Sequence, residues 1–544
     1  MEIGICLGFV IWFLEFNKVT FDLLIKNGMI VDGSGKKPAF KADIGISGDK
    51  IFDIGNLSKA KAKTEIDASG KIVAPGFIDI QNHSDNYGSI FADNHFESIV
   101  RQGITTILMG QCGSSLAPLV KGSLSSIQKW TAVEGINVNW QSQAEFFKSL
   151  SSRGSMVNLS TLVGHATLRR DFVGDAMRPL SSKEEDQICS LLKESMREGA
   201  FGLSIGLAYS HERLAAEEEL HKLLKIVLAE SGVVSFHLRN EGREAVSSMN
   251  EIFTFLRHNR VRSKISHLKA LGENSVATAE KLLKMLDVAY RDGLPISFDV
   301  YPYMASAVVL YLLLPEWAVL GGKAELEKRI RSKEVRKDII KDMDESAYPY
   351  EKIFIATGSL GQGFIGKSLA QIAKDQGVSG PEAVLNMLIA SRDQIIVFWH
   401  DLDESVVEIF IKHPLSMVAT DGSGYSAEKK FGNQIPHPRS FGTTARLLGH
   451  YVREKKILTL EEAVYKISGK PASWLGLKDR GIIEKNNFAD LVVFDAQTIK
   501  DLADYKNPFR YPEGIDNVIV NGKIALEKGE CKLPLAGRVI RKTK

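Results

Sequence analysis

Gly76-Phe-Ile-Asp-Ile-Gln-Asn-His-Ser-Asp85 is the stretch of sequence from which the fold of the chain can be inferred. Residues 77–80 are mostly apolar, as in a strand that is buried on both faces, and Pro75 with Gly76 marks the start of the strand. The strand then opens into a polar cluster that includes His83. A buried strand that ends in an imidazole and a carboxylate is a typical first strand of an α/β barrel, because barrel active sites form at the carboxyl ends of strands.

Seven further strand-like segments follow this stretch and alternate with segments of helical spacing. Each of them runs into a polar or reactive side chain. Together with the first strand, the strand ends carry His83, Cys112, His165, Tyr209, His237, His267 and Asp421. Eight strands in an α/β alternation are what a TIM-type (β/α)8 barrel requires, so this is the predicted fold.

Both ends of the chain contain short strands separated by turns, which predicts a small β-sandwich domain made from residues 21–73 and 475–544. The barrel is expected at 74–474. Within it, the interval of about 304–414 is too long for one crossover and has helical spacing, so it is predicted to be an inserted helical subdomain. Residues 1–20 are interpreted as an N-terminal apolar extension. A span across a bilayer takes roughly 20 apolar residues, and the apolar run from Ile3 to Leu14 is shorter.

The charge balance is close to neutral, with 69 basic and 66 acidic residues and a net charge of +3. We therefore expect no nucleic-acid partner and no membrane partner. The 4 cysteines include no closely spaced pair, which argues against a disulfide framework and favours a reducing, cytoplasmic location. The sequence leaves the oligomeric state open.

Cys112, His237 and His267 are candidate ligands of a catalytic zinc ion, because Zn²⁺ accepts thiolate and imidazole and three protein ligands leave a position for water. Asp421 is the natural residue to take a proton and pass it to a leaving group. Taken alone, Cys112 is more often a small buried hydrophobic residue, and Asp421 is more often a turn residue. His165 is interpreted as a core histidine outside the ligand set.

Several longer motifs go beyond single residues. They are Ala74-Pro-Gly-Phe-Ile-Asp79, Gln102-Gly-Ile-Thr-Thr106, Gly110-Gln-Cys-Gly-Ser-Ser-Leu-Ala-Pro118, Gly202-Leu-Ser-Ile-Gly-Leu-Ala-Tyr209, His237-Leu-Arg-Asn-Glu241, Ser266-His-Leu-Lys269, Asp299-Val-Tyr-Pro-Tyr303, Thr420-Asp-Gly422 and His437-Pro-Arg-Ser-Phe-Gly-Thr443. In these motifs the sequence resembles the N-acyl-D-amino-acid deacylases, or D-aminoacylases, of the amidohydrolase superfamily. The resemblance runs from about Phe21 to about Lys528. Its most specific part is the motif with Cys112, because most amidohydrolases use a carboxylated lysine or a glutamate as a metal ligand where this group uses cysteine.

The resemblance implies a role for each candidate residue. It makes Cys112, His237 and His267 the tight zinc site, and it makes Asp421 the catalytic acid and base. The side chains that it assigns to the substrate carboxylate are Lys269, Arg439, Tyr209, Tyr301 and Tyr303. A guanidinium fork has the shape to bind a carboxylate, which gives Arg439 a chemical reason for its place.

One position departs from the family pattern, which usually has His-x-His at the end of the first strand. Here the sequence is Gln81-Asn82-His83. His83 is therefore left as a ligand of a weak second metal site, with Gln81 in place of the usual histidine. Because a glutamine is a poor zinc ligand, the sequence predicts one tightly bound zinc ion and puts the second site in doubt.

The predicted function is zinc-dependent hydrolysis of the amide bond of N-acyl-D-amino acids, which releases a carboxylate and a free D-amino acid. The pocket walls are expected in the insertion and in the loop 423–440. Two alternatives on the same scaffold are a cyclic-amide hydrolase and a D-dipeptidase, since a fold does not fix the substrate. An alternative of another class is a non-catalytic amidohydrolase-like protein that serves assembly or binding.

Overall fold

The computed structural model describes residues 20–543 except 122–123, 132, 134–135, 175, 177, 273, 359, 362, 392–394, 429–434 and 534. The apolar extension predicted for residues 1–20 therefore lies outside the described residues, apart from Thr20. Among the helices of the described part, none is both long and apolar enough to cross a membrane.

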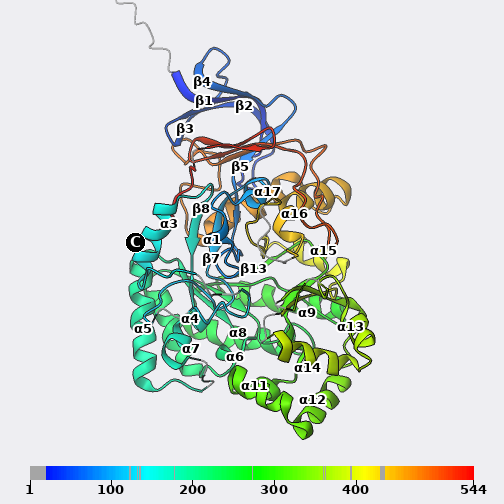
Figure 1. Cartoon of the computed structure of the whole chain (residues 1–544). Coiled ribbons are helices and arrows are strands. Elements are labelled where there is room, and N and C mark those ends of the chain that lie inside the picture. Colours follow the sequence, from blue (N-terminus) through cyan, green and yellow to red (C-terminus); the bar gives the residue numbers. More distant parts are fainter. Residues whose placement is uncertain are drawn as a thin grey trace, which may run out of the picture.

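Both ends of the chain contribute strands to one sheet of nine strands, which lies at the top of Figure 1. The strand order is β21-β20-β19-β18-β5-β1-β2-β3, and β4 pairs with β1. Strand β18 pairs with β5, so backbone hydrogen bonds join the two chain ends within a single sheet. The strands are β1 (Thr20–Ile30), β2 (Phe40–Ser47), β3 (Lys50–Gly55), β4 (Lys61–Asp67), β5 (Ile72–Pro75), β18 (Leu491–Phe494), β19 (Ile515–Val520), β20 (Lys523–Glu527) and β21 (Glu530–Cys531).

Two parallel sheets lie below it in the same view. The first has the order β6-β7-β8 and the second the order β17-β13-β12-β11-β10-β9. Nearly all of their residues are buried, which explains the continuous apolar runs in the sequence. The strands are β6 (Phe77–Asp79), β7 (Ile104–Met109), β8 (Asn158–Thr161), β9 (Val163–Gly164), β10 (Gly202–Gly206), β11 (Val233–His237), β12 (Arg262–Ile265), β13 (Ile296–Val300) and β17 (Ser416–Val418).

The two parallel sheets meet at two places. At one, the chain passes directly from β8 to β9, with only Leu162 between them. At the other, the segments that follow β6 and β17 exchange backbone hydrogen bonds: the N–H of Asp421 donates to the carbonyl of Gln81 (2.8 Å), and the N–H of His83 donates to the carbonyl of Gly422 (2.7 Å). The strand ends that carry the predicted site residues are therefore neighbours in space.

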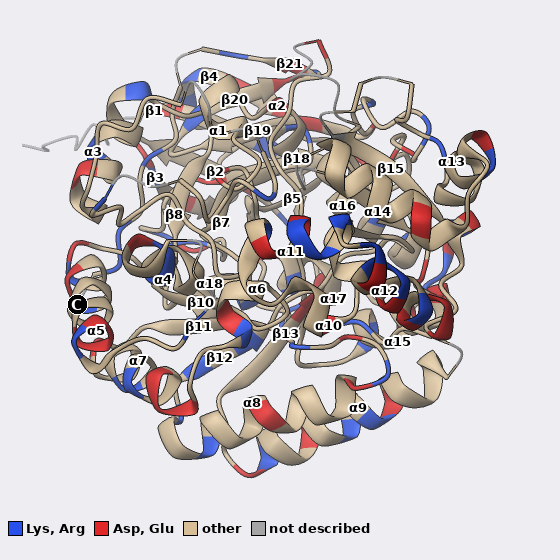
Figure 2. Cartoon of the chain, turned by 60° about the horizontal axis from the view of Figure 1, so that its bottom comes forward, with Lys and Arg blue, Asp and Glu red and all other residues tan. Residues whose placement is uncertain are grey.

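Helices surround the parallel strands on the outside, as Figure 2 shows for α5, α7, α8 and α9 around β10–β13. The helices of this layer are α3 (Gln143–Arg153), α4 (His165–Val173), α5 (Ser182–Arg197), α7 (Glu217–Ala229), α8 (Ala245–Asn259), α9 (Ser275–Arg291) and α15 (Glu404–Lys412). Shorter or later helices are α1 (Ser89–Ala92), α2 (Glu97–Val100), α6 (Ser210–Arg213), α16 (Arg439–Arg446), α17 (Leu460–Ile467), α18 (Gly469–Leu475) and a π-helical segment at Leu447–Glu454.

Helix α5 illustrates why these segments are helical. Ser181 and Glu184 form a capping box at its start, which satisfies backbone N–H groups that have no partner inside the helix. Ile188, Leu192 and Met196 recur at intervals of four residues and are buried, so they form one apolar stripe that packs inward.

The insertion is not purely helical, which corrects the prediction for about 304–414. It contains an antiparallel sheet of order β14-β16-β15, in addition to helices and a core of its own. The apolar run of β16 is rich in β-branched residues, so it pairs with strands on both sides, and the helical spacing of its neighbours hid this signal. The elements are β14 (Ser306–Val309), β15 (Ile353–Gly358), β16 (Ile395–Trp399), α10 (Glu316–Val319), α11 (Gly322–Arg331), α12 (Lys333–Glu345), α13 (Leu369–Gln376), α14 (Gly380–Ser391) and two 3₁₀ turns at Leu310–Leu313 and Tyr350–Lys352.

A buried polar network centred on Asp490 joins the nine-stranded sheet to the parallel strands. Its carboxylate accepts hydrogen bonds from Arg480, from the side chain of Asn158 on β8 (3.1 Å) and from the backbone N–H of Asn521 (2.7 Å). Arg480 also donates to the side chain of Asn521 (2.8 Å). Asp490 and Arg480 are both buried, so each charge depends on the other for its partner.

We expect Asp490→Ala to destabilise the fold by about 3–5 kcal/mol, the usual cost of removing one partner of a buried ion pair. The reason is that the Arg480 guanidinium would remain buried without its carboxylate. Thermal unfolding checks this, with Lys63→Ala as the control, because Lys63 and its partner Asp22 form a pair on the surface. If both variants melt at the temperature of the wild type, the Asp490 network does not hold the nine-stranded sheet to the parallel strands.

Candidate metal centre

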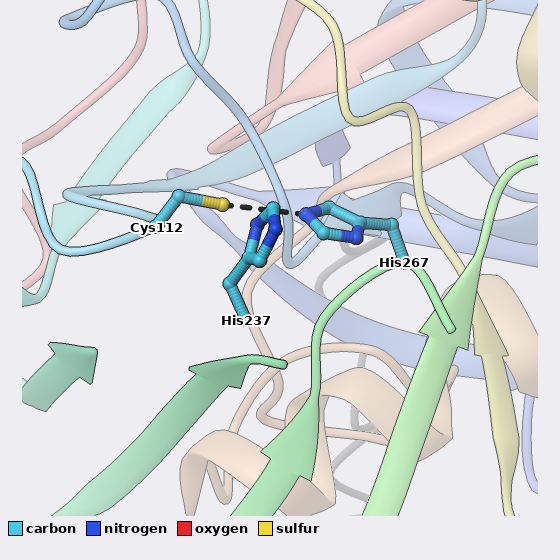
Figure 3. A group of neighbouring side chains, drawn as sticks. All are labelled: Cys112, His237 and His267. Atoms are coloured by element: carbon cyan, nitrogen blue, oxygen red, sulfur yellow. Dashed lines mark hydrogen bonds between the residues drawn. The ribbon is translucent and has the colours of Figure 1, made fainter. Parts of the chain in front are cut away.

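Three side chains from the ends of parallel strands meet inside the protein. Cys112 follows β7, His237 is the last residue of β11, and His267 follows β12. One potential ligand atom from each lies within 4.8 Å of the others, and the Cys112 Sγ atom is 3.4 Å from the Nε2 atom of His267. Figure 3 shows the thiol and the two rings pointing toward one another. The structure thus brings together the three ligands predicted from the sequence.

The backbone at this site has an uncommon conformation. The φ angles of Cys112, His267 and Asp421 are 54°, 34° and 49°, in the left-handed region that residues with a side chain seldom adopt. Surrounding contacts hold this conformation: the backbone N–H of His267 donates to the Oδ1 atom of Asp299 (2.8 Å). Strain of this kind is concentrated at functional sites, where it fixes the direction of a side chain.

The donor set fits a divalent ion of borderline softness such as Zn²⁺. Burial opposes ionisation of the Cys112 thiol, but His267 and His237 beside it hold its pKa well below the usual range, which favours the thiolate that a metal requires. The Nδ1 atom of His237 is buried and has no hydrogen-bond partner among the described residues. Three protein ligands leave a position open, as in catalytic sites.

A carboxylate lies behind one of the candidate ligands. The Oε1 atom of Glu241 is 3.0 Å from the Nδ1 atom of His267, and both oxygens of Glu241 accept from the Lys269 ammonium, at 2.9 and 3.0 Å. Burial opposes the charge on Glu241, but Lys269 nevertheless holds its pKa below the usual range. Metal-binding histidines are commonly oriented by such a carboxylate. No role was predicted for Glu241 from the sequence.

Asp421 lies beside this group and carries two charged contacts. Its Oδ1 atom is 3.0 Å from the Nε2 atom of His83, and its Oδ2 atom is 2.7 Å from the Nη1 atom of Arg439 at the start of α16. Burial opposes the charge, but Arg439, His267 and His83 hold the pKa of Asp421 well below the usual range. Asp421 is therefore held in the ionised form by its cationic neighbours.

Gln81 and His83 occupy the position expected for a second metal site. The other ring nitrogen of His83 is 3.0 Å from the side-chain amide nitrogen of Asn86, so both of its ring nitrogens have protein partners. The amide nitrogen of Gln81 lies 3.3 Å from the Cys112 Sγ atom and 3.4 Å from the Oδ1 atom of Asp421.

The predicted carboxylate-binding residues fall into two groups. Arg439 lies with its guanidinium carbon 4.6 Å from the ring centre of Tyr301, and the Lys269 ammonium is 5.7 Å from the same ring. Tyr209 packs against His237 with ring centres 5.0 Å apart. Tyr303 forms the second group by itself, because its hydroxyl donates a hydrogen bond to Asp501 (3.2 Å).

A pocket opens beside Asp421 and Arg439 and contains about 340 Å³ of empty space, part of it open to solvent. Strands β14, β15 and β16 of the insertion form one wall, and residues within 422–425 and 435–440 of the expected loop form another. The side chains of these walls are mostly apolar or aromatic. They include Ala307, Ala356, Ile396, Phe398, Tyr425, Ile435 and His437.

His165 lies outside the ligand group, as the sequence analysis interpreted it. Its two ring nitrogens face two buried carboxylates: Nε2 is 2.6 Å from Glu219 and Nδ1 is 3.3 Å from Glu212. Arg169 also pairs with Glu219. These contacts balance the charges of a buried polar cluster, which is a structural role.

Comparison with known proteins finds a family and solved structures that are similar to this chain. A family model described as the amidohydrolase family matches residues 64–255 and 430–526. The D-aminoacylase of Alcaligenes xylosoxydans xylosoxydans is 31% identical over 523 residues, which cover 96% of this chain and 98% of that protein.

Two solved structures are also similar over nearly the whole chain. A D-aminoacylase, studied for the role of its binuclear metal centre and described by one-metal activation and second-metal attenuation, has a TM-score of 0.82 at 29% identity. The N-acyl-D-glutamate deacylase of Bordetella bronchiseptica, complexed with zinc and a phosphonate that mimics the tetrahedral intermediate, has a TM-score of 0.81 at 28% identity. Each comparison covers 96% of this chain and 100% of the other.

We expect Cys112→Ala to lose most of its bound metal, because two imidazoles without a thiolate do not complete the site. Elemental analysis of the dialysed protein measures this. Cys189→Ala is the matched control, since Cys189 lies in α5 on the outer layer and should leave the metal content unchanged. Full metal retention by Cys112→Ala would remove the thiolate from the ligand set.

Proposed function

The chain belongs to the amidohydrolase family, and on that premise we propose that it is a zinc-dependent deacylase of N-acyl-D-amino acids. It cleaves the amide bond and releases a carboxylate and a free D-amino acid. The observation that carries the proposal is the position of Cys112, His237 and His267 next to an ionised Asp421 and a buried Arg439.

Cys112, His237 and His267 are the residues that hold the zinc ion. The thiolate and imidazole donors support this choice of metal, as does the zinc in the structure of the related N-acyl-D-glutamate deacylase. When bound, zinc polarises a carbonyl group and makes water a nucleophile near neutral pH. Glu241 fixes the orientation of the His267 ring through its contact with Nδ1 (3.0 Å).

Asp421 moves the proton in this reaction. A carboxylate held in the ionised form can accept a proton as the attacking water loses it, and it can then donate that proton to the departing amine. The amine must gain a proton to leave, so one residue serves both halves of the reaction. His83, 3.0 Å from Asp421, and Arg439 on the other oxygen orient the carboxylate.

Arg439 binds the substrate carboxylate. Within the described residues, its Nε and Nη1 atoms are buried and make no hydrogen bond, because the approach of Nη1 to Asp421 is an ion pair without the alignment of a hydrogen bond. Buried donors without a partner are costly, and a carboxylate in the pocket satisfies them. Lys269 is less suited to this role, since its ammonium group already donates to both oxygens of Glu241.

We also infer that the parallel strands close into the predicted (β/α)8 barrel. The direct passage from β8 to β9 and the hydrogen bonds between the segments after β6 and β17 support closure at both junctions. In this arrangement residues 74–474 form the barrel, about 304–414 are inserted into it, and the nine-stranded sheet is the small domain.

A substrate panel tests the proposed activity. The zinc-loaded protein should hydrolyse N-acetyl-D-amino acids and leave the L-enantiomers almost untouched. Hydantoins and D-dipeptides belong in the same panel, because their hydrolysis would reveal a cyclic-amide hydrolase or a D-dipeptidase. Turnover of one of these classes in place of the N-acetyl-D-amino acids would overturn the proposed substrate, and inactivity of a zinc-replete protein toward all of them would favour the non-catalytic reading.

We expect Asp421→Asn to keep its zinc and lose about 10²- to 10⁴-fold in kcat, because an amide cannot carry the proton that general acid–base catalysis requires. The zinc content of each preparation is the internal control, since the three ligands are unchanged. A zinc-replete variant with nearly normal kcat would place the proton transfer on another residue.

We expect Arg439→Lys to keep the fold and lose kcat/KM roughly 10- to 100-fold, because a charge-assisted hydrogen bond contributes about 1.5–3 kcal/mol and lysine lacks the second donor of the fork. Arg446→Lys on the same helix is the matched control, because Arg446 donates to the carbonyl of Pro302 and pairs with Asp501. A larger loss in the Arg446 variant would reverse the assignment.

A further inference from the structure

A fully buried lysine lies directly behind the metal centre. Lys264 is on β12 and has no exposed surface, although lysine is almost never buried unless it is paired. Its ammonium donates to the Oδ2 atom of Asp299 (2.6 Å), to the Oε1 atom of Gln81 (2.5 Å) and to the hydroxyl of Ser266 (3.3 Å). Its three donors therefore each have an acceptor.

This lysine fixes the orientation of Gln81. An ammonium group only donates hydrogen bonds, so the amide oxygen of Gln81 has to face Lys264 and the amide NH₂ group has to face the opposite way. There the nitrogen lies 3.3 Å from the Cys112 Sγ atom, 3.4 Å from the Oδ1 atom of Asp421 and 3.5 Å from the Nε2 atom of His83.

The Gln81 side chain is consequently a poor ligand for a cation at the second metal position. An amide nitrogen has no lone pair to offer, and the amide oxygen of Gln81 is turned away and bound to Lys264. The ammonium group of Lys264, paired with Asp299, lies just behind this oxygen and holds it in that position. The residues present do not fit a second metal ion, in contrast to the related D-aminoacylase with its binuclear centre.

We propose that Gln81 and Lys264 together replace the second metal ion, so that this centre holds a single ion at Cys112, His237 and His267. The amide donates toward the acceptors that a second ion would bind, and the ammonium group of Lys264 holds the amide in this orientation. The inference rests on the proposed metal site, and it makes Lys264 a positioning residue that sets the metal stoichiometry.

The proposal requires both residues, which makes it testable by a double substitution. Gln81→His introduces an imidazole but leaves the ammonium in place. Lys264→Gln removes the charge, and its amide can still donate to Asp299, but it adds no good ligand. Only the protein with both changes should accept a second ion.

Zinc content after equilibration with excess zinc and dialysis is the measurement, with the melting temperature as a check on folding. The wild type, each single variant and the control Lys466→Gln should retain one zinc ion per chain, and the double variant should retain two. Lys466 is a suitable control because it is also a buried lysine, bound to the carbonyl of His413 and the hydroxyl of Ser416.

The outcomes distinguish a failure of this inference from a failure of the proposed deacylase function. Two zinc ions in the wild type would overturn the inference and leave the deacylase proposal intact, and this result needs no variant. Two ions in Gln81→His alone would show that Lys264 has no part in it. A folded double variant with one ion would refute the replacement. A wild type that binds no zinc would overturn the proposed function and the inference with it.

Discussion

The ligand His267 and the side chain of Gln81 both depend on hydrogen bonds to the carboxylate of Asp299. One oxygen accepts the backbone N–H of His267 and so supports the strained turn that directs this ligand. The other oxygen neutralises Lys264, which in turn orients Gln81. Asp299 lies on β13, next to β12 in the parallel sheet, and the strand register therefore sets the geometry of a site whose ligands come from other strands.

The sequence predicted the parts of the site that follow from strand order. Because parallel strands end at one edge, Cys112, His237, His267 and Asp421 could be placed together from their positions after apolar runs. Partners behind these residues depend on tertiary neighbours and were not predictable in the same way. Glu241 carried no local signal beyond its charge, whereas Lys264 did, as a lysine in a strand expected to be buried. The sheet of the insertion was missed because β16 is short and lies among helices.

Charge balance explains why so many ionised groups can be buried in one place. Lys264 pairs with Asp299, Lys269 with Glu241 and Arg439 with Asp421. Removing one member of such a pair costs far more than the pair contributes, because its partner is left charged in a medium of low polarity. The site is therefore sensitive to single substitutions, even at residues that touch neither metal nor substrate.

The pocket wall and the metal ligands belong to different structural units. Strands β14, β15 and β16 line the pocket and belong to an insertion with its own hydrophobic core, while the ligands stand on the parallel strands. The wall residues Ala356, Ile396 and Phe398 nevertheless pack in one hydrophobic cluster with Cys112, so a substitution in the wall also acts on a metal ligand. The shared cluster therefore limits which wall residues can change during evolution without disturbing the metal centre.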